Sequence, residues 1–231
     1  MEDAMEEQIN VKELVMKEMI GYFESEKSKK LKNYQQLNQY VIKGQILFTG
    51  SSLMEQFPIC EYCVDAGITK AVYNRGIGGY TTDDFLSAID VVLLDLQPSK
   101  VFINIGTNDI HAREDGEDWL THLLNNYEQI LTKCKEKLPD TEIYLMAYYP
   151  VNGTLPNSVG NPMMKVRTNA NLALANSKVA ELADRFGYHF INVNDGLTDA
   201  DQNLKAEYTV DGIHMFAGAY HIVFENLKNY I

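Results

Sequence analysis

Short apolar runs alternate with longer helical patterns along most of this 231-residue chain. Nearly continuous apolar runs of this length are typical of strands buried on both faces of a sheet. Because strands that alternate with helices form parallel sheets covered on both sides, the pattern predicts an α/β fold. The expected strands are Gln45–Thr49, Lys70–Asn74, Lys100–Ile105, Thr141–Ala147 and Tyr188–Val193, and the expected helices are Thr81–Leu94, Asp118–Leu138, Met163–Phe186 and Phe216–Tyr230.

The first 43 residues are expected to form a helical extension that packs outside the main domain, residues 44–231. An apolar stripe at helical spacing predicts a first helix, and a second stripe predicts another. The charged stretch Glu24–Lys32 between them is either a solvated face or a break. An alternative role for this arm is the contact of a homodimer. The two stripes are Val11, Leu14, Val15, Met19, Tyr22 and Phe23, then Leu31, Tyr34, Leu37 and Val41.

Charge and cysteine content restrict the partners and the compartment. The formal net charge of −12 argues against nucleic acid or an anionic membrane as a partner. No apolar run approaches the roughly 20 residues that span a bilayer, and the acidic start lacks a secretory pattern. Three cysteines are an odd number, which argues against a complete disulfide framework, and Cys60 and Cys63 lack the second pair of a four-thiolate zinc site. We therefore expect a cytoplasmic, reducing location.

A serine comes just after the first expected strand, and an aspartate and a histidine lie near the end of the chain. The serine is Ser52, and Asp211 and His214 form an Asp-x-x-His motif. A hydroxyl becomes a good nucleophile when a neighbouring imidazole takes its proton, and a carboxylate orients that imidazole. The three residues therefore predict a nucleophile, a general base and an orienting carboxylate.

Two further motifs follow the second and third expected strands. Residues 74–79 read Asn-Arg-Gly-Ile-Gly-Gly, and residues 106–109 read Gly-Thr-Asn-Asp. Both can supply hydrogen-bond donors to a developing oxyanion. Because sites in parallel sheets form beyond the carboxyl ends of the strands, Ser52, Gly79 and Asn108 are expected at one edge of the sheet.

With these motifs the chain resembles the SGNH hydrolases of the GDSL esterase/lipase superfamily. Ser52, Gly79, Asn108 and His214 match the four residues that name the family's blocks, and Asp211 matches its triad carboxylate. The resemblance extends from about residue 45 to about residue 225, and the asparagine block matches almost letter for letter.

Two positions depart from the family pattern. Ser51 stands where the family name has an aspartate, which affects only the hydrogen bonding of the turn. Tyr80 follows Gly79 where many relatives have a small or acidic residue, and this change is expected to alter the pocket wall.

The resemblance implies a three-layer α/β/α sandwich with a five-stranded parallel, flavodoxin-like sheet, and hydrolysis of a small-molecule carboxylic ester through an acyl-enzyme. Ser52 is expected to attack the acyl carbonyl, His214 to transfer the protons and Asp211 to orient His214. The backbone N–H groups of Ser52 and Gly79 and the side-chain amide of Asn108 are expected to hold the oxyanion. No cofactor and no metal are implied. Lysophospholipase and thioesterase activities stay open within the same family.

Other classes of protein fit the sequence less well. The Gly-x-Ser-x-Gly motif of conventional α/β-hydrolases lacks its second glycine here, Thr81 interrupts a dinucleotide-binding Gly-x-Gly-x-x-Gly, and no P-loop motif occurs. A metal hydrolase using His214 with Asp211, or His111 with Asp109, stays open, although no His-x-x-x-His motif is present. A non-catalytic binding module is the remaining alternative, and the retained nucleophile, base and oxyanion positions argue against it.

Residues 79–82 and the loop Tyr149–Pro162 are expected to line the substrate pocket, because both leave from the edge of the sheet that carries the site. Their small and polar residues predict a preference for short acyl groups, and the asparagines of the loop suit O-acetyl groups of carbohydrates. The main bulk of this expected wall comes from Tyr80, Tyr148, Tyr149 and Leu155.

Overall fold

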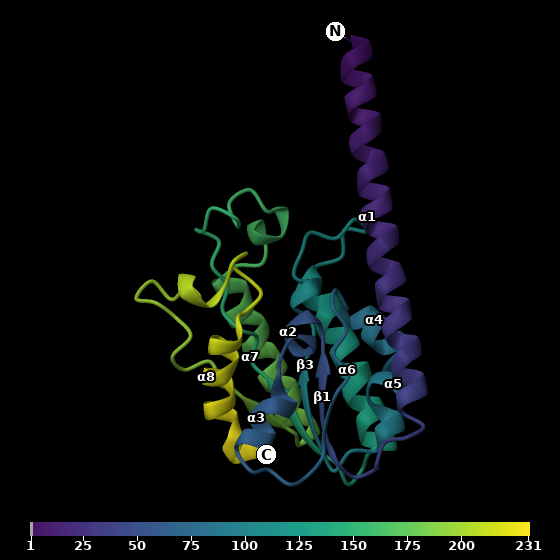
Figure 1. The fold of residues 1–231 in the computed structure, drawn as a ribbon, viewed down its shortest axis with the longest axis vertical. Coiled ribbons are helices and arrows are strands. Elements are labelled where there is room, and N and C mark those ends of the chain that lie inside the picture. Colours follow the sequence, from purple (N-terminus) through teal and green to yellow (C-terminus); the bar gives the residue numbers. More distant parts are fainter. Residues whose placement is uncertain (1) are drawn as a thin grey trace.

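The computed structural model describes residues 2–231 and is built on one five-stranded parallel sheet (Figure 1). The strand order is β2-β1-β3-β4-β5, and every neighbouring pair is parallel. This is the flavodoxin-like order, so the predicted fold class is confirmed. The strands are β1 Ile46–Gly50, β2 Val72–Asn74, β3 Lys100–Asn104, β4 Glu142–Met146 and β5 His189–Ile191.

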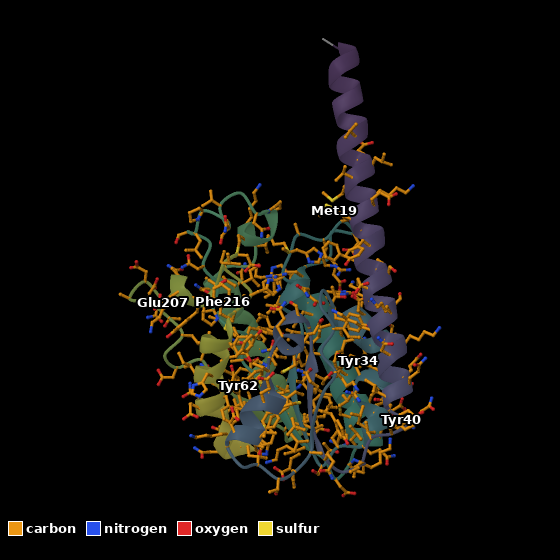
Figure 2. All side chains as sticks on the ribbon, in the orientation of Figure 1. Met19, Tyr34, Tyr40, Tyr62, Glu207 and Phe216 are labelled. Atoms are coloured by element: carbon orange, nitrogen blue, oxygen red, sulfur yellow. The ribbon has the colours of Figure 1, made fainter. Side chains whose placement is uncertain are left out.

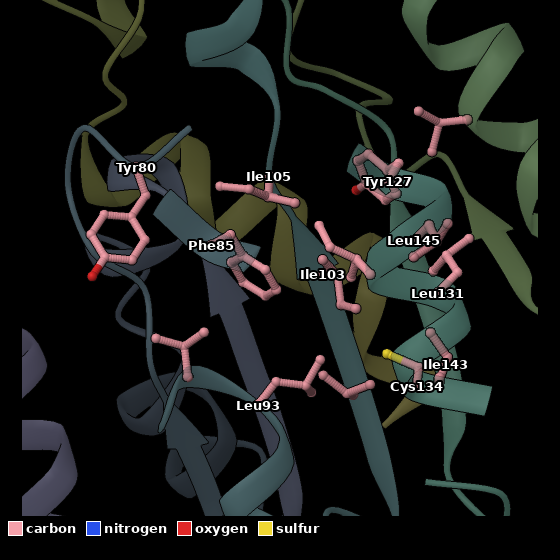
Figure 3. Close-up of a cluster of buried hydrophobic side chains, with 14 of the residues drawn as sticks. Tyr80, Phe85, Leu93, Ile103, Ile105, Tyr127, Leu131, Cys134, Ile143 and Leu145 are labelled. Carbon is pink, nitrogen blue, oxygen red and sulfur yellow. The ribbon is translucent and has the colours of Figure 1, made fainter. Parts of the chain in front are cut away.

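Helices cover both faces of the sheet because successive strand residues point to opposite sides. Leu47, Val101 and Ile103 face one hydrophobic cluster, part of which Figure 3 shows, together with α4, α5, α6 and α7. Phe48 and Phe102 face a second cluster, with α3 and α8. The helices are α3 Ile59–Asp65, α4 Thr82–Ser87, α5 Ile89–Val92, α6 Trp119–Lys137, α7 Asn169–Phe186 and α8 Ala217–Leu227.

The helix expected over Thr81–Leu94 is divided, which corrects the prediction. It forms α4, α5 and the 3-10 turn η1 (Leu94–Leu96), with a bend at Ala88. The Ser87 hydroxyl donates to the carbonyl of Asp84, one turn earlier. A serine that bonds back into its own helix bends it, and the β-branched residues that follow are weak helix formers.

The helix expected over Met163–Phe186 is also shorter than predicted. A 3-10 turn, η3 (Pro162–Lys165), precedes α7, which starts only at Asn169. The Thr168 side chain accepts the backbone N–H of Asn171, so Thr168 caps the helix instead of continuing it.

A single long helix, α1 (Glu2–Leu37), replaces the two helices expected in the N-terminal extension. The charged stretch Glu24–Lys32 continues the helix and is not a break, and it is only partly solvated, because Lys27 and Lys30 pair with Asp84 and Glu55 of the main domain. Lys27 pairs with Glu24, and Lys29 with Glu26, one turn apart. Such pairs stabilise a helix, so the stretch continues it.

Only the second half of α1 packs on the domain. Tyr34 donates to the carbonyl of Gly76, and Asn38, just after the helix, donates to the carbonyl of Val91. Arg75 lies against the Tyr34 ring and donates to Asn38. The first half projects beyond the sheet, and Figure 2 shows its side chains standing clear of the body near Met19.

The projecting half of α1 carries a large exposed apolar surface. This outcome differs from the expected packing of the first stripe on the domain, because the body does not reach that part of the helix. Among the described residues, no helix combines the length and apolarity needed to cross a membrane. The exposed apolar residues of this half are Val11, Leu14, Val15, Met16 and Met19, and the apolar residues Ile20, Tyr22 and Phe23 follow where the helix reaches the body.

Candidate active site

Ser52 sits at the carboxyl end of β1, where the strand turns directly into the short helix α2 (Ser52–Glu55). A β-carbon on Gly50 would collide with the carbonyl of Asn104 in the neighbouring strand, so this tight exit from the sheet requires glycine. The Ser52 Oγ lies 2.9 Å from Nε2 of His214. Ser51, the position that departs from the family pattern, is buried, and its hydroxyl has no hydrogen-bond partner among the described residues.

Asp211 and His214 are brought together by a tight turn before α8. His214 Nδ1 lies 2.6 Å from Asp211 Oδ2, and the other carboxylate oxygen accepts the backbone N–H groups of Ile213 (2.9 Å) and His214 (2.8 Å). Gly212 has a φ of +81°, a left-handed conformation that favours glycine. The structure therefore joins Ser52, His214 and Asp211 in one chain of hydrogen bonds.

The Asp211 carboxylate is kept ionised by this arrangement. Partial burial by itself raises the pKa of Asp211, but hydrogen bonds from the His214 ring and from the backbone N–H groups of Ile213 and His214 outweigh it. The pKa of Asp211 therefore lies below its ordinary value, and the carboxylate is charged at neutral pH. A charged carboxylate favours the proton on Nδ1 of His214, which leaves Nε2 free to accept the serine proton.

The loop Tyr149–Pro162 supports this turn and does not form the pocket wall expected for it. Asn152 donates its backbone N–H to the carbonyl of Gly212 (2.8 Å), and Ser158 donates its hydroxyl to the carbonyl of Asp211 (2.9 Å). Asn157 donates to the carbonyl of Val210 (3.1 Å). Because these polar groups are used to position the Asp211–His214 turn, the loop has a structural role beside the site.

The glycine and asparagine motifs lie beside Ser52, as expected from their positions after β2 and β3. Gly79 adopts a φ of +77°, and the N–H of Gly78 donates to Glu55. Asn108 lies in the 3-10 turn η2 (Thr107–Asp109), and its side chain donates to the carbonyl of Tyr80 (2.9 Å). Ser52, Gly79 and Asn108 all line one pocket with His214.

That pocket has a volume of about 640 Å³ and is closed on one side by helix α1. We call the α1 residues of its lining the helical wall: Ile20, Tyr22, Phe23, Glu24, Glu26, Lys27 and Lys30. The remaining lining residues are Ser52, Glu55, Gln56, Gly78, Gly79, Asn108, Met163, Arg167, Ile213 and His214.

The prediction of which residues give the pocket wall its bulk is wrong. Tyr80, Tyr148 and Tyr149 are buried in the protein interior, and neither they nor Leu155 belong to the lining. The sequence reasoning missed the helical wall and Arg167. A stripe formed by Met16, Ile20, Phe23 and Lys27 at helical spacing was present in the sequence, but nothing in that spacing says what the stripe faces.

A group of possible metal ligands lies outside this pocket. Asp83, Asp109 and His122 place ligand atoms within 4.8 Å of one another, and neither metal pair considered from the sequence forms such a group among the described residues. Buried Asp109 accepts the backbone N–H and hydroxyl of Thr82, and His122 bridges Asp83 and Glu117. These groups are thus already used in protein hydrogen bonds that fix the start of α4 beside α6.

The three cysteines are free thiols, so Cys60 and Cys63 form no disulfide. Burial raises the pKa of Cys63 to about 11 and raises that of Cys60 as well. Neither thiol has the lowered pKa of a redox-active Cys-x-x-Cys pair.

A parallel α/β/α sheet whose carboxyl edge carries hydrogen-bonded serine, histidine and aspartate side chains beside glycine and asparagine donors defines a hydrolase-type site. The model of the GDSL-like lipase/acylhydrolase family matches residues 58–222, and the chain belongs to this family. The matched segment contains Gly79, Asn108, Asp211 and His214, and Ser52 lies just before it.

Two solved structures are similar to this chain, one in sequence and fold and the other in fold alone. A Streptococcus pneumonia protein whose structure carries only a provisional description as a platelet activating factor is 33% identical, with a TM-score of 0.83, over 94% of this chain and 98% of that one. A mutant acetylxylan esterase from Geobacillus stearothermophilus shares the fold at 16% identity and a TM-score of 0.62, over 81% and 94% of the two chains.

One curated relative is much longer than this chain. N-acylneuraminate cytidylyltransferase of Escherichia coli O18:K1:H7 is 30% identical over 154 residues, which are 66% of this chain and 33% of that protein. The chain therefore spans about a third of the length of this relative.

Proposed function

We propose that the protein is a serine esterase that cleaves carboxylic esters through an acyl-enzyme. The observation that carries this proposal is the hydrogen-bonded chain from Ser52 through His214 to Asp211, which opens into a pocket. The direct test is labelling of Ser52 by a fluorophosphonate, followed by peptide mass analysis. Labelling of another residue, or none, would contradict the proposal.

The mechanism follows from the positions of these groups. Ser52 Oγ attacks the acyl carbonyl while His214 Nε2 takes the hydroxyl proton, and the carbonyl π electrons move to the oxygen. His214 then gives its proton to the leaving alcohol, and the acyl-enzyme forms. In the second half, His214 takes a proton from the water that attacks the acyl carbon. When the C–O bond to Ser52 then breaks, His214 returns this proton to Ser52 Oγ and the carboxylic acid is released. The oxyanion of both steps is held by the N–H groups of Ser52 and Gly79 and by the Asn108 amide.

We assign short acyl groups to the site, with O-acetyl groups of carbohydrates as the favoured candidates. The side of the pocket near Gly79 is narrow, since a β-carbon on Gly79 would lie 3.2 Å from Cε of Lys27 in the helical wall. One protein of similar fold is an acetylxylan esterase, which is named for the removal of acetyl groups from a carbohydrate.

The chain-length preference is our first prediction. Across p-nitrophenyl esters, kcat/KM is expected to fall by about 10-fold or more between butyrate and octanoate, because even one of the additional methylenes of octanoate that does not fit loses roughly 1–3 kcal/mol of transition-state binding. Acetylated xylo-oligosaccharides assayed in parallel test the carbohydrate assignment. A maximum at octanoate or longer esters contradicts the preference for short acyl groups.

A lysophospholipase or thioesterase activity is the second candidate, and a specific observation favours it. Ile20, Phe23 and Met163 give one part of the pocket an apolar surface, which suits a hydrocarbon group of the substrate. A lysophospholipid and a long-chain acyl thioester in the same panel decide between the candidates, because either one would then be turned over faster than butyrate esters.

Activity is expected to survive chelation, which is our second prediction. The proposed steps need no Lewis acid, and the Asp83, Asp109 and His122 group lies outside the pocket lining. Ester hydrolysis after dialysis against EDTA should equal that of the untreated protein. Loss of activity that a divalent metal restores would favour the metal-hydrolase alternative.

A further inference from the structure

Arg167 is a buried arginine at the pocket that forms no ion pair with a carboxylate among the described residues. The residue is only 3% exposed, it lines the pocket, and its Nε has no hydrogen-bond partner in the part of the chain that the structure describes. The arginines that do pair with carboxylates, Arg113 and Arg185, lie at the surface of the domain. Burying an unpaired charge costs free energy. We therefore expect a neighbouring group to stabilise the buried guanidinium of Arg167.

The only side chain that accepts a hydrogen bond from Arg167 among the described residues is Asn108. Nη2 of Arg167 lies 3.1 Å from Oδ1 of Asn108. Burial lowers the pKa of Arg167 to about 10, and Asp109 nearby acts in the opposite direction. The guanidinium therefore stays protonated at neutral pH, and its bond to the Asn108 oxygen is charge-assisted.

Asn108 is held at both ends of its side-chain amide. The oxygen accepts from Arg167, and the nitrogen donates to the carbonyl of Tyr80 at 2.9 Å. A primary amide has two N–H groups, so one of them remains for a ligand in the pocket that Asn108 shares with Ser52 and Gly79.

We propose that Arg167 is a positioning residue of the oxyanion hole, which it serves through Asn108. The planar guanidinium group of Arg167 fixes the position of the Asn108 side-chain oxygen. Its positive charge also polarises the Asn108 amide, so that the free N–H becomes a stronger hydrogen-bond donor. When Ser52 attacks and negative charge develops on the acyl oxygen, that donor is needed most. The inference rests on the proposed esterase function and adds a residue that the mechanism above does not use.

The test compares Arg167→Met and Arg167→Lys with the control Arg185→Met, which removes an exposed arginine paired with Glu128. Removing an oxyanion donor costs about 10²–10³ in kcat, so losing its support is expected to lower kcat roughly 10- to 100-fold with little change in KM. Arg167→Lys should lower kcat less than Arg167→Met, because lysine keeps the positive charge although it lacks the planar guanidinium group. Arg185→Met should behave like the wild type.

A double-mutant cycle distinguishes action through Asn108 from direct contact with substrate. In an Asn108→Ala background, Arg167→Met is expected to cost little further activity. The proposal would be overturned if the two substitutions lowered kcat by independent factors, so that the double variant showed the product of the two single losses. A rise in KM at constant kcat would overturn it as well. If Arg167→Met does not fold, as judged by its thermal melting, Arg167→Gln takes its place in the cycle. Wild-type kcat in a folded variant also overturns the proposal.

Fluorophosphonate labelling of the wild-type protein distinguishes a failure of this inference from a failure of the proposed function. Failure of fluorophosphonate to label Ser52 in the wild type contradicts the esterase function itself. Labelling of Ser52 in the wild type, together with unchanged kcat in the folded Arg167 variants, contradicts only the role of Arg167.

Discussion

Replacing Ser52 with alanine is expected to reduce kcat for ester hydrolysis by about 10⁴-fold or more, because the acyl-enzyme can no longer form. The Ser52 Oγ contacts His214 at the pocket surface, and its removal leaves no large cavity in the core. The melting temperature is therefore expected to change by no more than about 2 °C. Steady-state kinetics on the best ester of the panel and thermal melting measure the two effects.

The neighbouring serine provides a matched control. Ser51 is buried, and its hydroxyl has no partner among the described residues, so Ser51→Ala removes one oxygen next to the site without breaking a hydrogen bond. This variant should keep close to full activity. If Ser52→Ala retains a substantial fraction of wild-type kcat, or if Ser51→Ala shows the larger loss, the nucleophile has been assigned wrongly.

The second large effect is expected for Asp211→Asn, which should lower kcat by about 10⁴-fold. The Oδ1 of Asp211 accepts two backbone N–H groups, so the oxygen of an asparagine will take that position. The asparagine NH₂ then faces Nδ1 of His214 and makes it an acceptor. Nδ1 can accept only in the tautomer whose proton is on Nε2, and that tautomer cannot take the proton of Ser52.

Asp195→Asn is the control, because Asp195 is an exposed aspartate outside the pocket lining. The kcat of Asp211→Asn should stay low as the pH is raised, since the wrong tautomer persists, whereas the control should follow the wild-type profile. A loss smaller than about 10-fold would show that Asp211 does not orient the base.

The sheet could be predicted because its three inner strands, β1, β3 and β4, are buried along most of their length and therefore appear as short apolar runs. The run around Leu47 and the run around Val101 both identified strands, with ends displaced by only a residue or so. Helix ends were harder to predict. They depend on local hydrogen bonds, such as those of Ser87 and Thr168, which compete with continuation of the helix.

The residue types of the site were present in the sequence, but their surroundings were not. Ser52, Asp211 and His214 belong to recognisable motifs at predictable ends of elements, and the structure brings their side chains into contact. Arg167 belongs to no motif, and its importance arises from burial beside Asn108. Periodicity identified α1 as a helix with apolar residues but could not show that Phe23 reaches the pocket.

The helical wall determines how substitutions could alter the substrate range of this protein. Ser52, Asn108 and His214 are placed by the ends of strands and by the turns that follow them, whereas Ile20 and Phe23 belong to a helix anchored lower down, at Tyr34. The proposed function therefore assigns reactivity and selectivity to separate stretches of the chain. Randomising Ile20 and Phe23 should yield enzymes with altered substrate range and an unaltered rate of nucleophile labelling, so that new specificities can be selected without rebuilding the chemistry.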